Sequence, residues 1–172
     1  MTHFEKLNKI KTFSRHVRYT HPEAVLASNV TLMNVDAEFA VFAVVQGPNK
    51  DVLNHTTGPF MYINQFKHCS ELIRMPIESF LQLADQIGDP KAKLVILSNT
   101  GRCGSTLLTQ LFEELPKTIS ISEPEAFMAF THESTFDDEH PERRAQILQV
   151  PIAVSNKKLL FYDVNFKLNP IS

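Results

Sequence analysis

The chain has 172 residues, which is long enough for one full hydrophobic core or for one incomplete domain with a smaller appendage. Its net charge of −2 excludes a general attraction to nucleic acid or to anionic membranes, so any anion-binding site must be local. Two cysteines are too few for a disulfide framework, and we find neither a signal peptide nor an apolar stretch near the roughly 18 residues of a membrane helix. We therefore expect a cytoplasmic protein without nucleic-acid or membrane partners.

The first half of the chain predicts a small, mainly antiparallel β region. Residues 1–22 are a basic lead-in, which we interpret as a solvated face rather than as a contact to nucleic acid or to a membrane. Apolar and β-branched residues then predict strands at 29–35 and 38–45, followed by a turn at 46–50. The run Phe60-Met-Tyr-Ile-Asn-Gln-Phe66 indicates a further strand.

A helix follows and completes the N-terminal region, which we assign to residues 1–90. Pro76 opens this helix, because proline is tolerated in a first turn. Gly88-Asp-Pro90 ends it. Between these two limits one face of the helix is apolar, with Ile77, Phe80, Leu81, Ala84 and Ile87.

Residues 91–172 have the alternating pattern of an α/β fold. Three apolar runs predict strands at 93–98, 118–122 and 158–164. Leucines and a phenylalanine at helical spacing predict a helix over 105–115, and one or two more helices fit between Glu125 and Val150, where Pro141 is a plausible start. Strands that alternate with helices favour parallel pairing with right-handed crossovers.

The loop between the first of these strands and its helix is the most informative segment, with the sequence Ser98-Asn-Thr-Gly-Arg-Cys-Gly-Ser-Thr106. A small-residue loop that leads from a buried strand into a helix can turn its backbone N–H groups toward an anion, and the helix N-terminus adds partial positive charge. The loop is not a nucleoside-triphosphatase motif, because Ser105 stands where that motif requires lysine after its last glycine. The cation precedes the glycine instead, as Arg102.

This arrangement resembles the 5′-phosphosulfate loop of sulfotransferases, in which Lys or Arg precedes a small residue, Gly and two Ser/Thr residues. The matching residues are Arg102-Cys-Gly-Ser-Thr106, followed by Leu107-Leu108. Ser120-Ile-Ser-Glu-Pro-Glu125 is similar to the acidic turn that carbohydrate- and protein-type members often carry after the next strand. The resemblance extends over roughly residues 92–170 and implies a parallel sheet with P-loop-containing topology.

The resemblance also implies a reaction and a set of site residues. The co-substrate would be 3′-phosphoadenylyl sulfate, no metal would be needed, and sulfate would pass to a hydroxyl or amine acceptor that the sequence does not identify. Arg102 would supply the cation at the developing charge, and Glu123 would be the general base. Glu123 could equally cap the helix that follows Pro124, and both interpretations stay open. The residues that would bind the co-substrate are Gly101, Arg102, Cys103, Gly104, Ser105 and Thr106.

The family's contacts to the 3′-phosphate come from a later segment, for which this sequence offers no matching positions. The resemblance therefore implies an incomplete sheet and a truncated chain that has little transferase activity by itself. The alternative is a catalytically silent α/β module that keeps the loop for folding or for binding a partner.

Other chemistries fit the sequence less well. A small-molecule kinase is disfavoured because no lysine follows Gly104 and no obvious magnesium-binding Asp ends the second α/β strand. Neither Cys69 nor Cys103 starts the C-x5-R motif of tyrosine phosphatases, so we interpret Cys103 as a small loop residue rather than as a nucleophile. The seven histidines show neither an i, i+4 pair nor cysteine partners at zinc spacing, so we expect no metal site.

Overall fold

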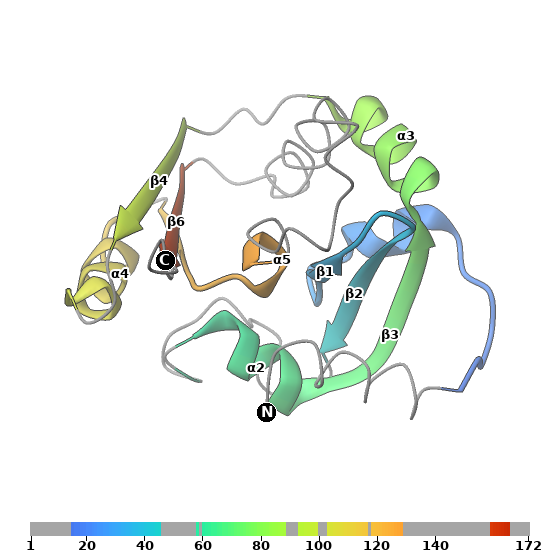
Figure 1. The fold of residues 1–172 in the computed structure, drawn as a ribbon, viewed down its shortest axis with the longest axis horizontal. Coiled ribbons are helices and arrows are strands. Elements are labelled where there is room, and N and C mark those ends of the chain that lie inside the picture. Colours follow the sequence, from blue (N-terminus) through green and yellow to red (C-terminus); the bar gives the residue numbers. More distant parts are fainter. Residues whose placement is uncertain are drawn as a thin grey trace, which may run out of the picture.

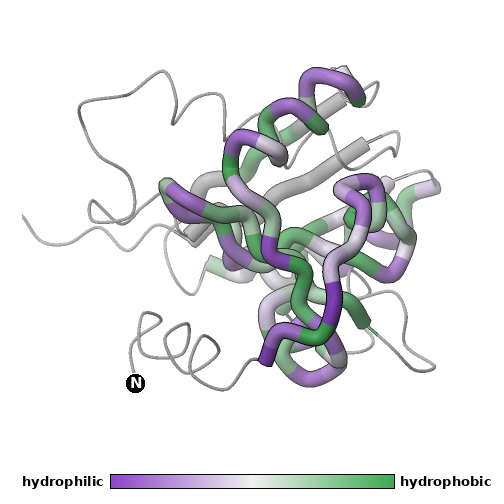
Figure 2. Tube along the Cα trace, turned by 90° about the vertical axis from the view of Figure 1, so that its right-hand side faces the viewer, coloured by the Kyte–Doolittle hydropathy of each residue, from purple (hydrophilic) through white to green (hydrophobic). Residues whose placement is uncertain are grey.

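The computed structural model describes residues 15–45, 58, 60–88, 93–99, 103–116, 118–128 and 159–165. These residues form helices and two separate three-stranded sheets, as the mixed α/β pattern of the sequence predicts (Figure 1). Individual elements alternate between hydrophobic and hydrophilic residues along the chain, as expected where one side of an element is buried (Figure 2). The predicted boundary between an N-terminal region and an α/β region falls between the two sheets.

The first sheet is antiparallel with the order β1-β2-β3. Its strands are β1 (Val30–Val35), β2 (Phe39–Val45) and β3 (Cys69–Pro76). The predictions for the first two strands are confirmed, and the turn between them is built on Asp36. Its Oδ1 accepts hydrogen bonds from the backbone N–H groups of Glu38, at 2.9 Å, and of Phe39, at 2.7 Å.

The prediction of a strand over 60–66 is wrong, because this segment forms helix α2 (Met61–His68). The residues that α2 buries are Met61, Asn64 and Gln65, which stand at positions i, i+3 and i+4. Two of these three side chains are polar, so the buried face left no hydrophobic period in the sequence. The Gln65 amide instead donates hydrogen bonds of 2.9 Å to Thr31 Oγ1 and to the Leu32 carbonyl of β1.

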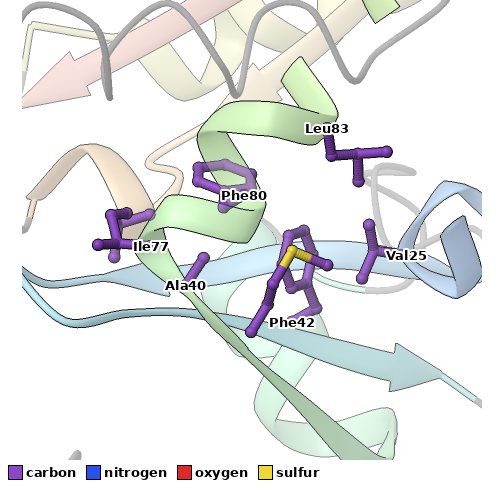
Figure 3. Close-up of a cluster of buried hydrophobic side chains, with 8 residues drawn as sticks. Val25, Ala40, Phe42, Ile77, Phe80 and Leu83 are labelled. Carbon is purple, nitrogen blue, oxygen red and sulfur yellow. The ribbon is translucent and has the colours of Figure 1, made fainter. Parts of the chain in front are cut away.

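The hydrophobic core of the first sheet lies beneath helix α3 (Ile77–Ile87), with the short 3-10 helix η1 (Pro22–Leu26) beside it (Figure 3). The rings of Phe42 and Phe80 meet edge to face, with centroids 5.7 Å apart. The predicted helix is confirmed, and Gly88 ends it with a φ of 73°. The eight residues of this core are Val25, Val35, Ala40, Phe42, Met75, Ile77, Phe80 and Leu83.

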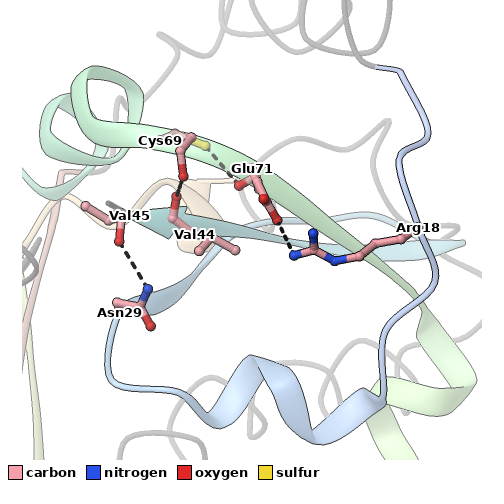
Figure 4. Close-up of polar contacts among 7 residues, drawn as sticks. Arg18, Asn29, Val44, Val45, Cys69 and Glu71 are labelled. Atoms are coloured by element: carbon pink, nitrogen blue, oxygen red, sulfur yellow. Dashed lines mark hydrogen bonds and ion pairs between the residues drawn. The ribbon is translucent and has the colours of Figure 1, made fainter. Parts of the chain in front are cut away.

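Polar contacts fasten the margins of the first sheet (Figure 4). Asn29 Nδ2 donates a hydrogen bond of 3.2 Å to the Val45 carbonyl and so joins the start of β1 to the end of β2. Arg18 forms an ion pair of 2.9 Å with Glu71 on β3, which ties the segment before η1 to the sheet. Both of these charged side chains remain largely exposed, so the ion pair adds little stability.

The second sheet has the order β4-β6-β5, and β6 runs parallel to both of its neighbours. Its strands, β4 (Lys93–Asn99), β5 (Ile119–Ser122) and β6 (Leu159–Asn165), lie at the predicted places. Helix α4 (Ser105–Glu113) joins β4 to β5 and contacts β5 and β6. Between 125 and 150 the structure describes α5 (Glu125–Met128), and the start predicted at Pro141 lies outside the described residues.

Helix α4 forms as predicted, but its apolar residues are not buried. Thr109 is the residue of this helix that is buried, and four leucines are between 38% and 62% exposed. Three of them lie on α4 and one follows its end; they are Leu107, Leu108, Leu111 and, after the helix, Leu115. The helical spacing therefore predicted the conformation correctly without predicting which side of the helix is covered.

Candidate functional site

The loop that leads into α4 is described from Cys103 onward. Cys103 and Gly104 are exposed, and Ser105 is the first residue of the helix. Gly104 has φ 88° and ψ 14°, a left-handed conformation that glycine adopts without strain. The other predicted cofactor residues of this loop, Gly101 and Arg102, lie outside the described residues.

The N-terminus of α4 offers backbone N–H groups to an anion. Gly104 is the N-cap residue of α4, and within the described part of the chain no side chain caps this helix end. The first turn of α4 contains no acidic residue. A Cβ atom at Gly104 would meet nothing within 4 Å, so the space in front of this backbone is open. The first N–H groups of a helix and its partial positive charge favour an anion at such a place.

Ser105 and Thr106 are half-buried at the start of the helix. One turn further along, Thr109 is 5% exposed, and its hydroxyl donates a hydrogen bond of 3.0 Å to the Ser105 carbonyl. This bond satisfies the buried hydroxyl of Thr109 within its own helix, at the same carbonyl that the helix backbone uses.

Glu123 follows the end of β5 and is half-buried. Its φ of 47° makes it the non-glycine residue with a positive φ in the described chain. A residue before proline normally adopts an extended conformation, and a left-handed one costs on the order of 1–2 kcal/mol. Ser122 and Pro124 on either side are buried, so the packing of its neighbours holds Glu123 in this conformation.

The loop before α4 and the turn at Glu123 leave the second sheet at the same edge. Since β4, β5 and β6 are parallel, their carboxyl ends lie together. One strand separates β4 from β5, so their ends are two strand spacings apart, about 10 Å. Ligands of open parallel sheets bind at this edge. The backbone therefore brings Gly104 and Glu123 to the side of the sheet where ligands of open parallel sheets bind.

Asp163 is an acidic residue near this edge that the sequence analysis missed. It lies on the central strand β6, where its register partners are Leu97 on β4 and Ser122 on β5. The signal was present in the sequence, because an apolar run, Leu159-Leu-Phe-Tyr162, is followed by an acid near the end of a strand. The strand adjacent to β4 is β6 rather than β5, so an acid at the end of the third α/β run lies next to the strand that leads into the loop.

Tyr62 lies on helix α2 and is half-buried. Burial raises the pKa of the Tyr62 phenol, and the negative charges of Glu123 and Glu125 raise this pKa further. The Tyr62 ring stacks on that of Phe60, with centroids 5.7 Å apart and planes 4° apart. The prediction of a strand over this segment did not indicate these surroundings of Tyr62.

The two cysteines differ in their surroundings. Cys103 is exposed beside the helix start, whereas Cys69 is half-buried. Burial raises the pKa of the Cys69 thiol, although hydrogen bonds to the backbone of Val44 and Glu71 lower it in part. Among the described residues, no three His, Cys, Asp or Glu side chains gather in a way that could hold a metal ion.

Comparisons of the chain with protein-family models, with curated proteins and with solved structures found no match in any of the three. None of the helices that the structure describes is long and apolar enough to span a membrane.

Proposed function

We propose that this chain is a sulfotransferase-like protein that binds the 5′-phosphosulfate end of 3′-phosphoadenylyl sulfate at the N-terminus of α4. The observation that carries the proposal is the left-handed Gly104 before an uncapped helix, at the carboxyl edge of a sheet whose strands are parallel. The Arg-Cys-Gly-Ser-Thr motif supports the choice of phosphosulfate over other anions. The P-loop-containing topology of the complete domain belongs to the same proposal.

The reaction transfers a sulfuryl group from phosphate to a hydroxyl or an amine. The acceptor atom forms a bond to sulfur, the bridging S–O bond breaks, and its electron pair stays on the phosphate oxygen. Positioned N–H donors and a cation at that oxygen stabilise the transition state. The backbone from Cys103 to Thr106 would supply the donors, and Arg102 would supply the cation. Glu123 would take the proton of the acceptor.

Thermal unfolding in the presence of adenosine 3′,5′-bisphosphate tests the binding site. We expect the nucleotide to raise the melting temperature of the chain and the substitution Arg102→Ala to abolish this protection. Arg18→Ala is the matched control, because Arg18 is an exposed cation of the first sheet. Equal protection of the Arg102 variant and the wild type would show that Arg102 is not in the site.

A second test assigns the base and requires a form of the protein with measurable sulfate transfer. If Glu123 is the base, Glu123→Gln lowers turnover by roughly 10²–10⁴-fold with little change in nucleotide affinity. If Glu123 only caps α5, the variant keeps its turnover and loses about 1 kcal/mol of stability. Asp163→Asn is the comparison, because Asp163 is a second carboxylate near the same edge of the sheet. A large loss of turnover in this variant alone would move the base to β6.

The exposed leucines of α4 favour a second candidate, a silent module that binds a partner. Leu107 and Leu111 are each more than half exposed and follow the loop directly. Thermal unfolding of the wild type and of the variant with both leucines replaced by Gln distinguishes the two candidates. If the chain binds the nucleotide, adenosine 3′,5′-bisphosphate protects both proteins. If the chain is a silent module, the nucleotide protects neither of them.

A further inference from the structure

Helix α4 turns its apolar residues to the side that a surface helix normally keeps polar. Thr109 is buried, whereas Leu107 and Leu111 are 62% and 57% exposed. Each of these leucines stands two residues from Thr109, about half a helical turn, so both lie on the opposite side of the helix. A surface helix normally turns its apolar stripe to the core and its polar residues to solvent. The outward apolar stripe of α4 therefore indicates a surface that contacts another protein.

The stripe continues along the whole helix. Leu107, Leu111 and Leu115 follow one another at intervals of four residues, and Leu108 stands beside them. Side chains at this spacing form a ridge that packs against the ridges of a second helix. Helix α4 contacts β5 and β6 and lies at the margin of the described fold, where a second helix has access to it (Figure 1).

The charges at the two ends of α4 indicate which helix fits. Within the residues that the structure describes, its N-terminus has no side-chain cap and no first-turn acid, and its last turn has no basic residue. The exposed Glu114 follows that last turn and stands seven residues after Leu107, close to two full turns, so it lies on the side of the stripe. A helix favours negative charge at its N-terminus and positive charge at its C-terminus. A second copy of α4 in antiparallel orientation would bring its Glu114 to the N-terminus of the first copy and receive the same contact in return.

We propose that α4 is the contact surface of a symmetric dimer, in which the leucine stripes of two copies of this chain pack in antiparallel orientation. Such a contact is self-complementary, as a two-fold interface requires. Leu111 lies at the two-fold axis, and Leu107 of one copy meets Leu115 of the other. In dilute solution the chain is monomeric and these leucines are exposed, so the contact stabilises the dimer rather than the fold of one copy.

Sedimentation equilibrium of the full chain tests the surface. We expect a reversible equilibrium between monomer and dimer in the wild type. Replacing Leu107 and Leu111 together with Gln should raise the dissociation constant by more than about 100-fold, because four leucines leave the interface. Leu26→Gln is the matched control, since Leu26 is 44% exposed on η1, and it should leave the constant unchanged. A wild type that stays monomeric at its highest soluble concentration, or a stripe variant that dimerises as tightly as the wild type, would overturn the proposal.

Cross-linking tests the orientation, in a chain whose exposed Cys103 is replaced by Ser. An antiparallel pair brings the new thiol of a Leu107→Cys chain beside that of a Leu115→Cys chain. We expect a mixture of these two variants to form a disulfide-linked dimer with copper phenanthroline as oxidant, faster than either variant alone. A mixture of Leu26→Cys and Leu115→Cys is the control and should stay unlinked. Faster linking within Leu107→Cys alone would indicate a parallel pair and contradict the proposal.

The acidic residue provides a third test. Glu114→Lys should raise the dissociation constant roughly 3–30-fold, because each of the two helix N-termini loses a negative neighbour. Glu23→Lys is the control at an exposed acid of η1 and should not change the constant. A Glu114→Lys dimer as tight as that of the wild type would contradict the placement of the helix ends.

Adenosine 3′,5′-bisphosphate separates this inference from the proposed function. Its phosphate and the Glu114 carboxylate of the second copy would compete for the same N-terminus, so bound nucleotide should raise the dissociation constant, and dimerisation should weaken nucleotide binding by the same factor. Bound nucleotide that leaves the dissociation constant unchanged would contradict the antiparallel placement. If calorimetry shows no binding of the nucleotide while the dimer forms, the proposed function fails and the dimer stands.

Discussion

The two sheets of this chain are stabilised in different ways. The first has its own core, in which Phe42 and Phe80 are fully buried under α3. In the second, the helix that connects two strands leaves Leu107 and Leu111 more than half exposed. Burial of large apolar side chains is the main source of stability in a domain, so the core under α3 stabilises the first sheet. In the second sheet, helix α4 leaves apolar side chains exposed, and the candidate site lies at the N-terminus of this helix.

The connections between strands are also different, because the first sheet contains a short turn and the second sheet contains long crossovers. In the first sheet a short turn at Asp36 joins β1 to β2, and the ladder forms between neighbours in the sequence. In the second sheet β4 pairs with β6, which follows it at a long distance along the chain. Parallel pairing requires such crossovers and brings the ends of several strands to one edge. The β1–β2 hairpin is therefore locally determined, whereas the parallel sheet gathers residues from distant segments.

The largest expected effect tests the difference in burial. Phe80→Ala should destabilise the protein by about 3–5 kcal/mol, because it leaves a cavity in the core of the first sheet. Leu111→Ala on α4 should stay within about 0.5 kcal/mol of the wild type, as exposed positions do. Urea unfolding of both variants measures these changes. A cost of Leu111→Ala near that of Phe80→Ala would contradict the comparison, since the α4 leucines would then be covered.

The next effect compares one glycine from each region. Gly88→Ala should cost about 1–3 kcal/mol, because φ 73° and ψ −169° lie in a region that only glycine adopts readily. Gly104→Ala should cost on the order of 1–2 kcal/mol for its left-handed backbone. Neither new Cβ atom meets a neighbour within 4 Å, so both costs come from the backbone. Thermal unfolding measures them.

Nucleotide binding distinguishes these two glycines further. Gly104→Ala should reduce the protection by adenosine 3′,5′-bisphosphate, whereas Gly88→Ala should keep it. Loss of protection in both variants would indicate a general loss of structure rather than a site at α4.

A smaller effect concerns the strain at Glu123. Glu123→Gly should be more stable than Glu123→Ala by about 1 kcal/mol, because glycine accepts the positive φ of 47°. Both variants lack the carboxylate, so the difference between them reports the backbone alone. Equal unfolding free energies would show that the turn relaxes once the glutamate is removed, and that the carboxylate itself maintains the conformation.

The smallest effect is expected at the margin of the first sheet. A double-mutant cycle with Arg18→Ala and Glu71→Ala should give a coupling energy of about 0.2–1 kcal/mol, because both side chains are largely exposed. This coupling should decrease with added salt. A coupling energy well above 1 kcal/mol would mean that this ion pair makes a larger contribution to the stability of the first sheet than exposed ion pairs normally make.

Local signals predicted several elements correctly. Pro76 and Gly88 mark the ends of α3. Ile77 and Phe80 of the predicted apolar face are buried, and Leu83, which that face did not include, is buried as well. The strands of the second sheet appear as apolar runs, as parallel strands usually do, although Ile96 on β4 is 51% exposed. The loop with Gly104 could be recognised because a left-handed helix start depends on a glycine at that place.

Other elements could not be predicted because their stabilising partners are distant in sequence. Helix α2 buries Asn64 and Gln65, and the amide nitrogen of Gln65 donates two hydrogen bonds to β1. Strand β3 has no alternating pattern, since most of its residues are only partly covered, and pairing with β2 determines it. A method that follows hydrophobic periods cannot detect either case.

By itself, therefore, the sequence determined the first two strands and the two ends of α3, since these depend on the residues within each segment. The tertiary structure decided the order β4-β6-β5, which places Asp163 between the two strands that lead to the site. It also decided the left-handed backbone of Glu123. These features depend on packing between segments far apart in the chain, because only such packing can offset a strained backbone or set the order of strands in a sheet.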